Sequence, residues 1–353
     1  MKLNSFELLS MDKSCKLKKF NKRIIGIEIL RMFLCFRIVL LHYYSSHNKY
    51  ILKLKGNQFQ VPCFFFISFY FLYPVISQRN IEKLKLRLER LLIPYIIYPF
   101  SVWIISNVMF LLLKYNRYNR LLTFKELKLN LILGKGIFGI GVLWFHFNLI
   151  IFTIIFFISS VFLKDLFLIS FQIIASISYI IQYSKINYEF FHQFKIYISQ
   201  PIGNLVETLP LAIFAFSLSN YNTFKNLTFN RKKNIFFSAI FLYYIFCYNI
   251  FLPIKGFSSA GIKHNISSFF IFSIFFLIPF EELNQKVLSL MQKITKYTQG
   301  IYCLHFLIQY YQKLFFDKSG TFIGCIILYI ISYFFSFIGF LIFQNTKLKF
   351  LFS

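Results

Sequence analysis

One apolar stretch that is long enough to cross a bilayer contains several ionisable side chains. The segment Ile24 to Tyr44 reads IIGIEILRMFLCFRIVLLHYY and includes Arg31 and His42. Ionisable groups at membrane depth are costly, so their presence indicates function. The eleven steps between them turn a helix through about 1100° and advance it by about 16 Å, so both side chains lie on one face at different depths. Glu28, three residues before Arg31, offers the alternative of an ion pair that only fixes packing.

The composition predicts an all-α, polytopic integral membrane protein. Of the 353 residues 58% are hydrophobic and only 14% are charged. Apolar runs of bilayer length recur along the chain, whereas a transmembrane barrel would need short alternating segments. We predict about ten transmembrane helices in one bundle, at residues 24–45, 60–77, 92–113, 142–163, 166–183, 199–218, 234–253, 266–282, 299–316 and 321–344.

The predicted organisation is a basic N-terminal tail (1–23), one membrane domain (24–344) and a short C-terminal tail (345–353). Lys and Arg are more numerous in the segments on the side of the N-terminus, which predicts a multi-pass protein of the plasma (inner) membrane with both termini cytoplasmic. The basic loop between the third and fourth spans opposes this orientation. Within it, an amphipathic segment followed by glycines predicts a short helix along the membrane surface and then a bend.

The formal net charge of +27 does not indicate nucleic-acid binding. The basic residues stand between apolar runs, which is where membrane proteins carry them. Arg87 and Arg90 are three residues apart on the predicted helix that leads into the third span, so they project from one side. Guanidinium groups suit phosphate, and the alternative is a basic patch on anionic lipid head groups.

Five stretches together resemble one family. In chain order they are GIEILRMFLCFRIVLLHYY, VPCFFFISFYFL, RLERLLIPY, VLWFHFNLIIF and GIYCLHFLI, from Gly26 to Ile308. They are similar to motifs of the membrane-bound acyltransferase-3 family, which includes O-acetyltransferases of surface polysaccharides. The Arg, ten residues, His signature falls on Arg31 and His42, and the Arg-x-x-Arg element on Arg87 and Arg90. One departure is Ser68-Phe69, where the family often has Ser-Gly.

The resemblance implies transfer of an acyl group, usually acetyl, from cytosolic acyl-CoA to a sugar hydroxyl of a lipid-linked or surface glycan. His42 would be the general base, with Arg31 beside it in catalysis. Arg87, Arg90 and Arg31 would bind the phosphates of acetyl-CoA, a donor co-substrate. We expect no permanently bound cofactor, no metal and no nucleic-acid partner.

Five further residues are weaker candidates for supporting roles: Glu28, Glu207, Trp144, His146 and His305. Glu207 would orient His42 or bind a sugar, and its alternative is pairing with a basic neighbour. For His146, which stands beside Asn148, and for His305, the alternative is a packed core residue. Trp144 is equally consistent with packing or an interface anchor.

Two rival functions remain open at this point. A transporter or glycan flippase would also use charges within the membrane, but it predicts internal repeats and paired broken helices, which the sequence does not show. The second rival is a family member that has lost catalysis.

Overall fold

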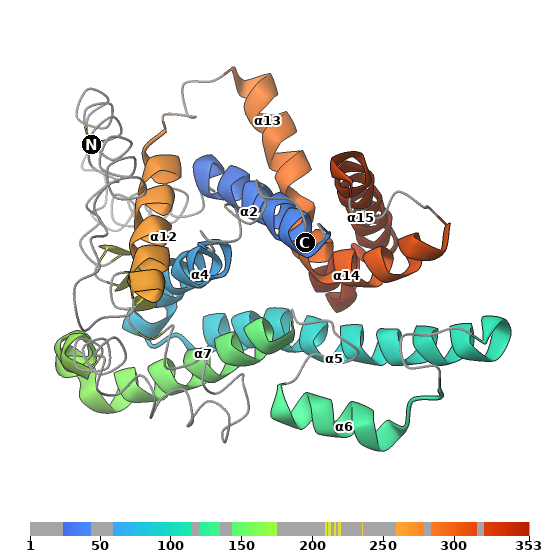
Figure 1. Cartoon of the computed structure of the whole chain (residues 1–353). Coiled ribbons are helices and arrows are strands. Elements are labelled where there is room, and N and C mark those ends of the chain that lie inside the picture. The colour runs from blue at the N-terminus through green and yellow to red at the C-terminus, as the bar shows by residue number, and fades with distance from the viewer. Residues whose placement is uncertain are drawn as a thin grey trace, which may run out of the picture.

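The structure is a computed structural model that describes residues 24–43, 59–114, 120–134, 143–174, 259–278, 284–315 and 321–352, with a few positions between 209 and 235. Within these residues every regular element is helical, as predicted (Figure 1). Four helices have the length and apolar composition of membrane spans. They are α4 (Gln60–Ser77), α5 (Ile81–Leu113), α7 (Leu143–Leu163, apolar from Trp144) and α15 (Phe322–Phe343). The class of multi-pass helical membrane protein is therefore confirmed.

The count of ten spans stays a prediction. Most of the predicted spans 199–218 and 234–253, and the second half of 166–183, lie outside the described residues. Helix α2 (Ile25–Tyr43) has 19 residues, but three of them are charged. Helices α12 (Ser259–Leu277) and α14 (Thr298–Phe315) occupy the predicted spans 266–282 and 299–316, and α12 begins earlier than predicted.

Helix α5 joins the predicted arginine-bearing helix and the third span into one helix of 33 residues. The Asn80 side chain caps its first turn by accepting a hydrogen bond from the Lys83 amide at 2.9 Å, which satisfies one of the free N–H groups there. Figure 1 shows α5 crossing the molecule, with α7 beside its first part. Arg87 and Arg90 therefore lie in the first three turns of a long helix and not in a loop.

Helix α6 (Phe124–Leu133) lies in the predicted amphipathic segment and packs beside the later part of α5 (Figure 1). Thr123 and Glu126 form a capping box at its start. At its end Gly134 has a φ of 62°, a left-handed conformation that favours glycine. The predicted short helix followed by a glycine bend is thus confirmed from Phe124 onward, and its place along the membrane surface stays a prediction.

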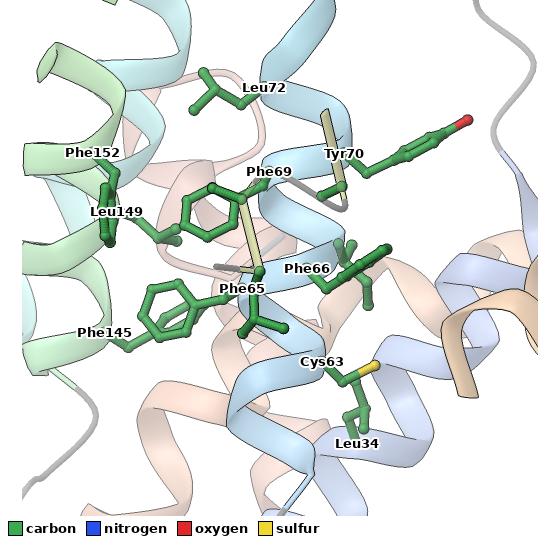
Figure 2. Packing of buried hydrophobic residues seen from close by; sticks show 14 of the residues in the cluster. Leu34, Cys63, Phe65, Phe66, Phe69, Tyr70, Leu72, Phe145, Leu149 and Phe152 are labelled. Atoms are coloured by element: carbon green, nitrogen blue, oxygen red, sulfur yellow. The ribbon is translucent and has the colours of Figure 1, made fainter. Parts of the chain in front are cut away.

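Helix α4 lies at the centre of the described core, between α2, α7 and α12. Its phenylalanines point to two sides, as Figure 2 shows. Phe65 packs on Phe145 of α7 with ring centroids 4.6 Å apart, and Phe66 packs on Phe272 of α12 at 4.8 Å. Because lipid tails are as apolar as these rings, close packing and ring geometry hold such helices together. The aromatic run of α4 thereby fixes the relative positions of the helices that carry the candidate residues.

The C-terminal part of the chain folds back onto the bundle. Amphipathic α13 (Gln285–Ile294) leads through the 3-10 turn η4 (Thr295–Tyr297) into α14, which pairs with α15. After α15 a second 3-10 turn, η5 (Lys347–Leu351), packs on α5 and α15. The remaining short element, η2 (Lys164–Leu166), follows α7.

Candidate functional site

Helix α2 carries Arg31 and His42, and each of them meets a different neighbouring helix. The Arg31 guanidinium bonds the Glu28 carboxylate at 3.2 Å, so the predicted pair exists, and it lies 5.6 Å from the ring centroid of Phe71 on α4. The His42 side chain is exposed, and its ring lies against His305 of α14 with centroids 5.8 Å apart. Arg31 and His42 thus mark two levels along one helix.

Arg87 joins three helices. Its guanidinium donates to the carbonyl oxygen of Ser68 on α4 at 2.9 Å, and its Nε to the hydroxyl of Thr153 on α7 at 3.5 Å. Arg31 lies over Phe71, about one turn along α4 from Ser68, and Arg90 follows Arg87 by about one turn of α5. The structure therefore brings the three predicted phosphate-binding arginines into one region, which we call the arginine group.

Arg90 differs from Arg87 because it is exposed. Its guanidinium lies 5.3 Å from the ring centroid of Phe350 in η5. It is the member of the arginine group that is open to an incoming anion, whereas Arg87 is held by oxygen atoms of the protein.

The departure at Phe69 leaves this arrangement in place. The Phe69 side chain is fully buried and packs on Phe152 and Phe156 of α7, at 5.2 and 5.8 Å between ring centroids. The carbonyl oxygen of the preceding residue, Ser68, still accepts from Arg87. A phenylalanine in place of glycine therefore fills the core and does not block the backbone contact.

A second group of residues gathers around Tyr302 of α14. Its ring centroid lies 6.3 Å from those of both His305 and His146, the latter on α7. His305 is fully buried, and its Nδ1 lies 3.3 Å from the Ile301 carbonyl oxygen, so this nitrogen carries the proton that is donated. With His42, these residues form what we call the histidine–tyrosine group: His42, His146, Tyr302 and His305.

Helix α7 connects the two groups. Thr153 meets Arg87 and His146 meets Tyr302. Seven residues separate Thr153 from His146, so they lie on one face of α7 about 10 Å apart along its axis. The arginine group and the histidine–tyrosine group therefore border a common side of the same helix.

The other predicted supporting residues have distinct placements. Trp144 packs on Phe65 with ring centroids 5.8 Å apart, which is a packing contact. Asn148 is fully buried, and neither amide atom has a hydrogen-bond partner in the described part of the chain, although a core role would require one. Glu207 lies outside the described residues.

Three contact residues were not among the predicted site residues. Tyr302 stands in the Tyr-x-x-His motif, which is a signal that points to it. The amide of Gln309 donates to the His42 carbonyl oxygen at 2.9 Å. No sequence motif points to Thr153 or Gln309, because the role of a polar residue inside an apolar helix depends on its contacts with other helices. Among the described residues, no group of three His, Cys, Asp or Glu side chains is placed to hold a metal ion.

A cavity of about 130 Å³ lies apart from both groups. It is bounded by α5, α14 and η5, through residues that include Tyr98, Cys303 and Leu351. Its lining is almost wholly apolar and contains none of the predicted site residues, so it does not match a site for transfer chemistry.

Comparison with known proteins identifies the family. No curated protein and no solved structure matches the chain. The model of the acyltransferase-3 family, described as an acyltransferase domain, matches residues 24–344. That range contains the arginine group, the histidine–tyrosine group and, in the described part of the chain, the four apolar helices that are long enough to span a bilayer. The chain therefore belongs to the acyltransferase-3 family of membrane acyltransferases.

Proposed function

We propose that this acyltransferase moves an acetyl group from acetyl-CoA to a hydroxyl of a sugar in a lipid-linked or surface glycan. One observation supports this most: the arginine group and the histidine–tyrosine group adjoin one face of α7, about 10 Å apart along its axis. Coenzyme A has phosphates at one end and the reactive thioester at the other. A cationic site and a base that are separated along one wall match such a donor.

The arginine group would bind the phosphates. Planar guanidinium groups form paired, charge-assisted hydrogen bonds with phosphate oxygens. The contacts of Arg87 with Ser68 and Thr153 hold one cation in place before the donor arrives, which lowers the entropy cost of binding. Exposed Arg90 would meet the donor first.

His42 would act as the general base. An imidazole has an unperturbed pKa near operating pH, and its side chain is exposed here. In the step, a ring nitrogen takes the proton of the sugar hydroxyl while its oxygen attacks the thioester carbonyl. The carbon–sulfur bond then breaks, and the proton passes to the departing thiolate of coenzyme A.

The proposed topology agrees with this chemistry. Both termini and the start of α5 would face the cytoplasm, where acyl-CoA is made available, and ten spans would enclose the path to His42. Residence in the plasma (inner) membrane would place the acceptor side toward cell-surface glycans.

Stabilisation by the donor tests the proposal. A ligand that binds only the folded state at one hundred times its Kd adds about 2.7 kcal/mol of stability. We expect acetyl-CoA to raise the Tm of the protein in nanodiscs, and Arg87→Ala and Arg90→Ala to reduce that shift. Arg79→Ala, which removes an exposed arginine just before α5, is the matched control and should retain the shift.

Two results would contradict the proposal. A wild-type Tm that does not respond to acetyl-CoA would favour a transporter. Mass spectrometry that finds the same glycan acetylation in cells with and without the protein would exclude the acceptor class.

A further inference from the structure

The last described turn, η5, lies directly against Arg90 of α5. In η5, the ring of Phe350 lies 5.3 Å from the Arg90 guanidinium, and the Lys347 ammonium bonds the Glu89 carboxylate at 2.7 Å, across 258 residues of sequence. We propose that η5 is a positioning part of the donor site: Lys347 neutralises Glu89 and Phe350 orients Arg90. This inference rests on the proposed function.

Several contacts hold η5 in a defined position. The Tyr98 hydroxyl on α5 donates to the Leu351 carbonyl oxygen, and the Leu351 side chain is buried. Phe352 stacks on Phe343 of α15 with ring centroids 6.0 Å apart and an angle of 4° between the rings. Thr346 caps the turn by accepting from the Leu348 amide at 3.2 Å. A segment anchored at both sides can fix the positions of Lys347 and Phe350.

Glu89 is the reason that such a segment is needed. It precedes Arg90 by one residue, and both side chains contact η5, Glu89 through Lys347 and Arg90 through Phe350, so a carboxylate lies beside the same turn as the exposed arginine. A carboxylate repels phosphate and competes with it for guanidinium groups. Since the Lys347 ammonium pairs with this carboxylate, Arg90 is left to bind the donor.

Phe350 acts on the second arginine through its ring. A guanidinium over an aromatic face is attracted by the ring and loses freedom to rotate. For exposed Arg90, this contact reduces the ordering that phosphate binding would otherwise require. The side chain is thus presented in a restricted set of orientations.

The ligand chemistry recognised here is a phosphate or diphosphate group. It can come from the donor or from an anionic lipid head group, and the experiment must separate these sources. We propose the donor, because Arg87 of the same group bonds Ser68 on α4, one turn from Phe71, and Phe71 contacts Arg31 on the helix that carries His42.

Binding of radiolabelled acetyl-CoA to the protein in phosphatidylcholine nanodiscs tests the proposal. We expect Lys347→Gln to raise the Kd about fivefold, the upper end of the range for an exposed charge pair. Lys286→Gln, at an exposed lysine of α13, is the matched control and should leave the Kd unchanged. The decisive variant is Glu89→Gln combined with Lys347→Gln, which should return the Kd to within about twofold of wild type, because no carboxylate is left to neutralise.

Three outcomes would overturn the proposal while leaving the proposed function intact. They are a wild-type Kd in Lys347→Gln, a double variant that binds as weakly as the single one, and a loss confined to nanodiscs that contain phosphatidylglycerol. The last outcome would assign the turn to lipid head groups. If wild-type protein does not bind acetyl-CoA in either bilayer, the proposed function itself fails.

Discussion

The imidazole rings of His42 and His305 lie with centroids 5.8 Å apart and an angle of 29° between their planes, although the residues stand near opposite ends of the described chain. The amide of Gln309, one turn further along α14, donates to the His42 carbonyl oxygen at 2.9 Å. Helix α14 therefore contacts both the ring and the backbone of the proposed base, and α14 determines where that base lies.

His305→Asn should lower kcat for acyl transfer ten- to a hundredfold. The variant removes the ring that packs against His42, and a displacement of the base by about 1 Å can lower the rate by this factor. The Kd for acetyl-CoA should stay unchanged, since the arginine group is untouched. Cys303→Ala, at another buried position of α14, is the control. An equal loss of kcat in both variants, measured in nanodiscs, would reduce His305 to a packing residue.

Arg87→Lys should weaken both stability and donor binding. One ammonium on a flexible stem cannot reproduce the two directed contacts with Ser68 and Thr153. We expect a loss of about 1–3 kcal/mol in unfolding free energy, together with a raised Kd for acetyl-CoA. Thermal unfolding with and without donor measures both, and Arg79→Lys should behave as wild type. If Arg87→Lys changes neither the unfolding free energy nor the Kd for acetyl-CoA, Arg87 acts only as a surface charge.

Gly300→Ala should destabilise the protein more than Gly339→Ala. A Cβ at Gly300 would lie 2.5 Å from the Ser336 hydroxyl oxygen and 3.1 Å from the Cα atom of Phe352, and backbone yields little. The atoms nearest to a Cβ at Gly339 belong to the ring of Phe352, and a side chain yields more readily than backbone. We expect about 1–3 kcal/mol for Gly300→Ala, less the gain in helix propensity. The opposite order of Tm values would show that η5 is not packed as described.

The start of α6 should lose stability in acid. Hydrogen bonds from the Arg120 guanidinium and the Thr123 amide lower the pKa of Glu126 to about 2. Because this pKa is below its unfolded value of about 4.3, the stabilisation is complete above the unfolded value and falls as the pH drops toward 2. Hydrogen exchange of α6 amides should therefore separate wild type from Glu126→Gln at pH 6 and less so at pH 3.

A constant difference between those two proteins across this range would mean that the carboxylate does not contribute. Lys125→Gln changes a neighbouring charge without touching the capping box, so it should show no such pH dependence.

Apolar runs predicted helix positions well where both ends of the run are polar. Helix α4 coincides with the predicted span 60–77, and α15 lies within the predicted 321–344. Helix α12 begins before the predicted start because its first turns contain Lys263, His264 and Asn265, and hydropathy detects only the part of a helix that suits lipid. Helix α5 was divided for the same reason.

The candidate site was predictable only where it is local. The spacing of three residues between Glu28 and Arg31 predicts their ion pair, which the structure contains. The approach of His305 to His42 and of Lys347 to Glu89 depends on how distant helices pack, which no spacing along the chain encodes. The motifs predict which residues belong to the site, and the packing of the helices determines which of them are in contact.

Acyl transfer by His42→Ala is the most direct test of the account. The wild-type protein and the variant, each in nanodiscs, would be given radiolabelled acetyl-CoA and a membrane glycan fraction from cells that lack the protein. Loss of a general base should lower kcat by about 10²–10⁴ while the Kd for acetyl-CoA is unchanged, because the exposed His42 side chain lies away from the arginine group. Transfer to the glycan at the wild-type rate by His42→Ala would contradict the central claim.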